Sequence, residues 1–169
     1  ADGQLGDGTT TRRTTPVAIG GLSQVTGVAA GSYHSLALTA AGQVWSWGSN
    51  SSGQIGDGTT QSRYTPVMVP GMSGVTGIGA GEGYSAALKT DGQPSGSVWT
   101  WGVDSYGQLG YGGLYDFHGR PGLVMDGVIA LAPGRQHTLV LTRDGRTLAW
   151  GEGGGAYGGR LGDGSRVRR

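Results

Sequence analysis

The chain repeats one phrase at an interval of about fifty residues. The stretch "GQLGDGTTTRRTTPV" at 3–17 returns as "GQIGDGTTQSRYTPV" at 53–67, and shorter versions follow at 107–114 and 159–165. The anchor positions Gln4, Gln54, Gln108 and Arg160 are therefore separated by 50, 54 and 52 residues. A fixed period of this kind is typical of architectures in which similar units pack on one another. The sequence predicts a single repeat domain over residues 1–169.

Each period also holds three further apolar segments, which in the first unit read "VTGVAAG", "HSLALT" and "VWSWG". Together with the "TPV" segment they make four short strand candidates per unit. The 38 glycines lie at fixed offsets between these runs, where they allow the positive φ angles of tight turns. No window keeps the i, i+3, i+4 apolar spacing of a helix. The prediction is an all-β protein.

Four antiparallel strands per unit at this period are typical of the blades of a β-propeller. The predicted units are 1–48, 49–102 and 103–151, with 152–169 starting a further unit. That makes roughly three blades, whereas propellers usually close with about four to eight. The chain is therefore predicted to be part of a longer propeller, or half of an oligomeric ring that a homodimer completes.

The order of motifs resembles one repeat family. The pattern G-x-V-W-x-W-G-x-(N/D)-x-x-G-Q-(L/I)-G-x-G, then T-P-V, then A-G-x-x-(H/Y)-(S/T)-x-(A/V)-L is similar to the repeats of the regulator of chromosome condensation family. The resemblance covers essentially the whole chain. It implies the family's seven-bladed propeller form, and it raises guanine-nucleotide exchange on a small GTPase as one possible activity. No unit here carries an insertion large enough to serve as that activity's protruding hairpin.

The composition argues against several classes of partner. A net charge of +1 favours neither nucleic acid nor a membrane surface, and no apolar run is long enough for a transmembrane helix. The chain contains no cysteine, which leaves the redox compartment open. The glycine-, threonine- and serine-rich style favours a bacterial secreted or cell-surface location over the cytoplasm.

The repeated polar residues are predicted to be structural. His34, Tyr84 and His137 occupy equivalent positions, as expected of a hydrogen-bonding group used once per blade. The turn residues Asp7, Asp57 and Asp163 are expected to bond their own backbone, because "GDGTT" lacks the alternating oxygen ligands of a calcium loop. The repeated tryptophans are expected to pack between blades. No metal, no cofactor and no catalytic residue is predicted.

The strongest departure from the repeat is "YGGLYDFHGRPG" at 111–122, which stands where the preceding unit has "DGTTQSRYTP". Aromatic residues and arginine are favoured in binding surfaces. The predicted binding residues are Tyr111, Tyr115, Asp116, Phe117, His118 and Arg120. The alternative is a loop that packs on its own blade.

Three functions follow from these observations. The first is a non-catalytic scaffold that binds a protein or a glycan through the propeller surface. The second is exchange-factor-like interaction with a small GTPase, which rests on the family resemblance alone. The third is a hydrolase or lyase with its site on the propeller loops, although no local motif proposes the residues.

Overall fold

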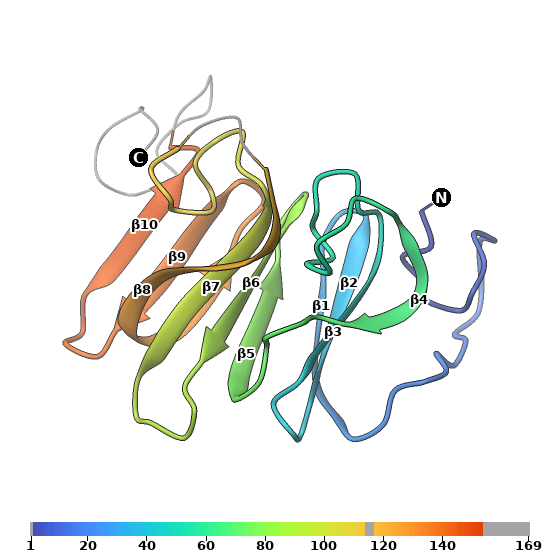
Figure 1. Cartoon of the computed structure of the whole chain (residues 1–169), viewed down its shortest axis with the longest axis horizontal. Coiled ribbons are helices and arrows are strands. Elements are labelled where there is room, and N and C mark those ends of the chain that lie inside the picture. The colour runs from blue at the N-terminus through green and yellow to red at the C-terminus, as the bar shows by residue number, and fades with distance from the viewer. Residues whose placement is uncertain (1, 114–116, 154–169) are drawn as a thin grey trace.

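The computed structural model describes residues 2–113 and 117–153, and these form ten strands and no helix (Figure 1). No membrane-spanning helix is therefore present among the described residues. The strands are β1 (Val25–Ala30), β2 (His34–Thr39), β3 (Val44–Gly48), β4 (Arg63–Met68), β5 (Val75–Ala80), β6 (Tyr84–Lys89), β7 (Gly96–Val103), β8 (Phe117–Pro133), β9 (His137–Thr142) and β10 (Thr147–Gly151).

The strands form two antiparallel sheets that lie side by side (Figure 1). The first has the order β1-β2-β3-β4, and the second has the order β10-β9-β8-β7-β6-β5. The long strand β8 pairs with β7 through its N-terminal half and with β9 through its C-terminal half. The second sheet is thus two blades joined by one continuous strand. The predicted all-β architecture of antiparallel propeller blades is confirmed.

Each blade takes its outer strand from the following sequence unit. Strand β4, which carries the second "TPV" segment, pairs with β3 of the first unit. The first "TPV" segment, at 15–17, was expected to be a strand but forms none. A strand needs a partner for its backbone groups, and this segment's counterpart pairs with a "VWSWG" segment. No such segment precedes residue 15 in this sequence.

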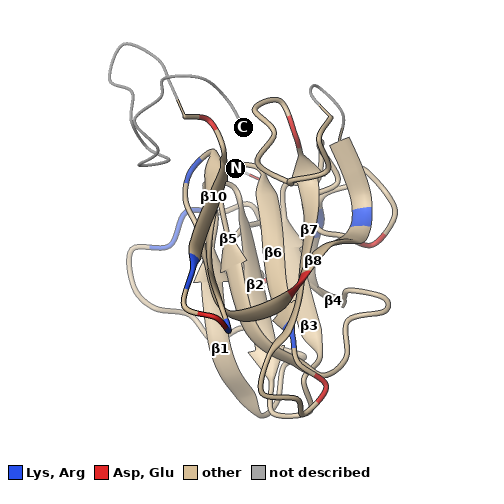
Figure 2. Cartoon of the chain, turned by 90° about the vertical axis from the view of Figure 1, so that its left-hand side faces the viewer, with Lys and Arg blue, Asp and Glu red and all other residues tan. Residues whose placement is uncertain are grey.

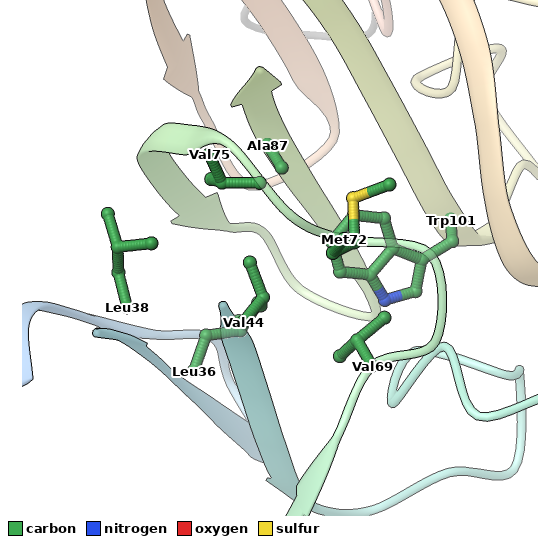
Figure 3. Close-up of a cluster of buried hydrophobic side chains, with 8 residues drawn as sticks. All are labelled: Leu36, Leu38, Val44, Val69, Met72, Val75, Ala87 and Trp101. Atoms are coloured by element: carbon green, nitrogen blue, oxygen red, sulfur yellow. The ribbon is translucent and has the colours of Figure 1, made fainter. Parts of the chain in front are cut away.

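The core lies between blades rather than within one. In the first cluster, Leu36, Leu38 and Val44 of the first blade face Ala87 and Trp101 of the second (Figure 3). The connection between β4 and β5 adds Val69 and Met72 to this cluster. The second cluster uses the equivalent repeat positions, with Leu88 and Val98 packed against Val128 and Val140. Every blade therefore depends on its neighbour to bury its apolar face.

The repeated tryptophans also tie the "GQ" turn at the start of each unit to the last strand of that unit. The indole nitrogens of Trp47, Trp101 and Trp150 each donate a hydrogen bond of 2.9 Å to a backbone carbonyl, namely Gln4, Gln54 and Gln108 respectively. Trp47 and Trp101 are buried. The structure therefore gives them the packing role predicted from their repetition.

Candidate functional site

The histidine and tyrosine that recur at the start of the second strand of a blade join adjacent blades. His34 Nε2 lies 2.9 Å from the hydroxyl of Ser85 in the next blade. The Tyr84 hydroxyl likewise reaches Thr138 Oγ1 in the third blade, at 3.0 Å. Each ring lies beneath a glycine, because a Cβ on Gly31 would come within 2.4 Å of the His34 ring.

The environment of His34 fixes its protonation state. The Ser85 hydroxyl donates its single hydrogen to the Gln54 carbonyl at 2.8 Å. Its oxygen therefore accepts the hydrogen bond from His34, and the neutral ring carries its hydrogen on Nε2. Burial lowers the pKa of His34 to about 4, because removal from water disfavours the charged imidazolium. A neutral, buried histidine with this fixed partner is a structural element and not an accessible acid or base.

The aspartates of the "GDG" turns are also engaged by the chain itself. Asp57 Oδ1 accepts hydrogen bonds from the backbone and side chain of Thr59, at 2.9 and 2.7 Å, and Oδ2 accepts from Arg63. Burial opposes ionisation of Asp57, but the hydrogen bonds from Thr59 and Arg63 outweigh it and lower the pKa of Asp57. Asp7 repeats the arrangement in the first turn. The predicted turn role of these two residues is confirmed, while Asp163 lies outside the described residues.

The third unit replaces this acid–arginine pair with two rings. Tyr111 stands where Asp57 would be, and its ring meets His118 edge-on at a centroid distance of 4.6 Å. The Tyr111 hydroxyl lies 2.6 Å from the carbonyl of Thr100 and 2.8 Å from that of Gly122, and burial raises the pKa of Tyr111. Position 122 has no side chain, which leaves room for this hydroxyl, because a Cβ there would lie 2.4 Å from it.

Beside these rings lies a groove of about 720 Å³ between two blades. One wall is the turn Gly58–Gln61, and the other is the start of β8, Phe117–Arg120. The backbone amide of Gly58 donates to the carbonyl of Gly119 at 2.9 Å, which holds the two walls together. Phe117 is 55% exposed at the edge, a high value for a large aromatic side chain.

The structure divides the predicted binding residues into three groups. Phe117, His118 and Arg120 line the groove together. Tyr111 supports the wall from within, through its contact with His118 and its hydrogen bonds. Tyr115 and Asp116 lie outside the described residues. The sequence did not predict the opposite wall at 58–61, because this turn follows the repeat pattern and carries no local signal of a binding role.

A second depression, of about 340 Å³, lies where the turns after β1, β5 and β8 meet. Glu82 in this depression forms an ion pair of 2.7 Å with Arg135 and accepts a second hydrogen bond from Gln136. These bonds lower the pKa of Glu82, the Arg135 bond most strongly. The carboxylate is thus committed to joining two blades. Among the described residues no group of three or more His, Cys, Asp or Glu side chains could hold a metal ion.

The fold and this surface define a repeat protein of the β-propeller class, built from blades that share their outer strands. Models of the regulator of chromosome condensation (RCC1) repeat match residues 1–38, 41–88 and 95–141, with a further match at 25–54. The chain belongs to the RCC1 repeat family.

Known relatives extend well beyond the matched region. The E3 ubiquitin-protein ligase HERC2 of mouse is 34% identical over 162 residues, which cover 89% of this chain and 3% of that protein. The ultraviolet-B receptor UVR8 of Arabidopsis thaliana is 38% identical over 60 residues, or 34% of this chain and 14% of its own length. Among solved structures, Prp20p of Saccharomyces cerevisiae superposes with a TM-score of 0.70 at 26% identity, over 83% of this chain and 34% of that one. Human WBSCR16 has a TM-score of 0.68 at 26% identity, over 86% and 37%.

Proposed function

We propose that this chain is a non-catalytic propeller scaffold that binds a protein partner at the groove between Gly58–Gln61 and Phe117–Arg120. The observation that carries the proposal is the wall formed by Phe117, His118 and Arg120, which exposes an aromatic ring and a cation. It lies where the preceding unit has its "TPV" strand. Aromatic residues and arginine supply much of the energy of protein interfaces. Related propellers bind proteins: Prp20 has been solved bound to Kap60, and Prp20p was studied for its binding to Gsp1p and histones.

Binding is favoured over catalysis because the side chains with shifted pKa values are already engaged in contacts that stabilise the fold. A catalytic site usually places groups with shifted pKa values in an open cleft. Here His34 and Tyr84 are buried between blades, and Asp57 and Glu82 are each paired with arginine. None of the four faces the groove. This arrangement gives the hydrolase or lyase alternative no support from the described residues.

The test is surface-plasmon binding of the intact chain to purified Gsp1p, core histones and an array of glycans. The variant Phe117→Ala should weaken binding to a protein ligand by about tenfold. Tyr33→Ala is the matched control, because Tyr33 is an aromatic residue of similar exposure (52% against 55%) outside the groove. Equal effects of the two variants, or binding to glycans alone, would overturn the proposal. Accelerated nucleotide release from Gsp1p would instead support the exchange-factor alternative.

We also propose that a second copy of this chain covers the outer faces of the terminal blades. Val28 is 76% exposed, whereas the equivalent residues Ile78 and Leu131 pack into the two inter-blade clusters. At the other end Leu141 is 36% exposed, whereas its equivalent Leu88 is 6% exposed. The face with Val28 corresponds to one side of the inter-blade clusters, and the face with Leu141 corresponds to the other side. The two faces can therefore pack on each other as neighbouring blades do within the chain. Light scattering should show a dimer that Val28→Glu dissociates, and a monodisperse monomer of the native chain would contradict the proposal.

A further inference from the structure

We infer that the partner segment bound by the groove is acidic and extended, with a carboxylate on Arg120 and an apolar side chain against Phe117. This inference rests on the proposed function and specifies the chemistry of its ligand. It depends on three features of the groove: an empty volume, a cation on one wall and the lack of an acidic residue among the described lining residues.

At Gly119, one wall of the groove lacks a side chain that the preceding repeat has. In the pairing of outer strands, Gly48 opposes Arg63 and Gly102 opposes His118, so Gly119 is the counterpart of Tyr64. The Tyr64 ring packs over the turn at Gly3, where a Cβ would come within 2.3 Å of it. At Gly119 a Cβ would meet only ordinary contacts, the nearest at 3.7 Å. The space at this wall is therefore left by the missing side chain of Gly119, and the backbone would allow a larger residue there.

The cation of the groove lies against the opposite wall. Arg120 replaces Thr65 of the preceding blade, and its guanidinium lies against Gly58, where a Cβ would come within 2.7 Å of Nη2. The planar guanidinium can bind a carboxylate through two parallel hydrogen bonds.

The charge balance of the groove selects an anionic ligand. Its described lining contains Arg120 and His118 as ionisable residues and no carboxylate. The nearby Asp57 is already neutralised by Arg63 and bonded by Thr59. A ligand carboxylate thus meets a cation without competition from the described lining residues, and the exposed Phe117 ring offers apolar surface to the neighbouring residue of the ligand.

The experiment measures fluorescence polarisation of a fluorescein-labelled peptide that alternates glutamate with leucine, against the intact chain. A peptide with lysine in place of glutamate is the ligand control. Arg120→Thr and Gly119→Tyr restore the residues of the preceding repeat and should each weaken binding by about tenfold. Arg12→Thr is the matched protein control, because it removes the same charge from an exposed turn outside the groove. Unchanged thermal unfolding shows that each variant is folded.

The outcomes separate the two proposals. Loss of binding in both groove variants, with Arg12→Thr unchanged, supports the acidic ligand. Equal losses in Arg120→Thr and Arg12→Thr, or equal binding of the lysine peptide, overturn it by showing non-specific charge attraction. Binding of a purified protein that requires Phe117 but survives Arg120→Thr overturns the acidic ligand and leaves protein binding at the groove intact. Protein binding that is indifferent to Phe117 overturns the proposed function itself.

Discussion

Replacing His34 with tyrosine should make the fold less sensitive to acid between pH 6.5 and 4. The folded chain holds His34 neutral, with a pKa of about 4 against an ordinary value of 6.5. Between these two values the unfolded chain binds a proton that the folded chain does not. The free energy of unfolding therefore falls as the pH falls, and the stability contributed above pH 6.5 is lost as the pH drops through the folded value.

The difference between 6.5 and about 4 corresponds to about 3 kcal/mol of unfolding free energy. Tyrosine is the matched replacement because the second blade already uses Tyr84 at this position, beneath Gly81 and beside a hydroxyl of the next blade. Tyrosine does not titrate in this range, so its variant lacks the contribution from position 34. The acidic residues titrate in both proteins, and their effect cancels in the comparison.

The assay is urea unfolding, followed by tryptophan fluorescence at a series of pH values from 7.5 to about 4. The gap in unfolding free energy between the native chain and His34→Tyr should shift in favour of the variant by up to about 3 kcal/mol across this range. A gap that stays constant with pH would refute the reasoning. It would mean that His34 gains its proton at the same pH in the folded and unfolded states.

Three further substitutions probe the packing. Gly122→Val should destabilise the fold by about 2 kcal/mol in chemical denaturation because its side chain would collide with the Tyr111 hydroxyl; adding Tyr111→Asp should recover part of the loss, and strict additivity would contradict the contact. Gly48→Ala should cost about 2 kcal/mol in the same assay, since Gly48 has a φ of 107° and faces backbone atoms, whereas Gly20→Ala should be nearly neutral. Trp101→Phe should lower the free energy of unfolding by about 1–3 kcal/mol through loss of the indole hydrogen bond in a buried site, and an unchanged midpoint would argue against that bond.

The repeat made the blade predictable, but not its boundaries. Alternation and glycine spacing were sufficient to predict β2 and β3 with their turn. The sequence units, however, begin at the turn, whereas the first sheet begins at β1 and ends with β4, a strand from the next unit. A repeat pattern is periodic and has no preferred starting point, so only backbone pairing decides which strands share a sheet. The merging of two blades likewise depends on β8 running without a break over 117–133, where the preceding unit has separate strands β4 and β5 joined by residues 69–74.

The candidate site was predictable in part for a similar reason. A break in the pattern at 111–122 singled out Phe117, His118 and Arg120, which the structure brings together along one wall of the groove; their role in binding stays a prediction. Tyr111 belonged to the same break, but its hydroxyl can bond Thr100 and Gly122 only because Gly122 has no side chain. That relation appears only once β7 and β8 are paired. The opposite wall at 58–61 obeys the repeat, so no local signal distinguishes it from the equivalent turn at 8–11.

The hydrogen bonds between blades explain why the strongest departure from the repeat can include an outer strand, at the start of β8. Figure 2 shows the charged residues mainly on connecting segments and strand ends, while most of each sheet is free of charge. The Gln54 carbonyl, in the turn between β3 and β4 of the first blade, accepts hydrogen bonds from both Ser85 and Trp101 of the second, so a change at any of these positions disturbs two blades at once. The outer strand faces no such constraint: Tyr64 and Gly119 occupy the same place, and both are compatible with the same pairing. Substitution there can open a groove and add a cation without weakening the contacts that hold the blades together, which makes the start of β8 a place where a repeat can acquire a ligand of its own.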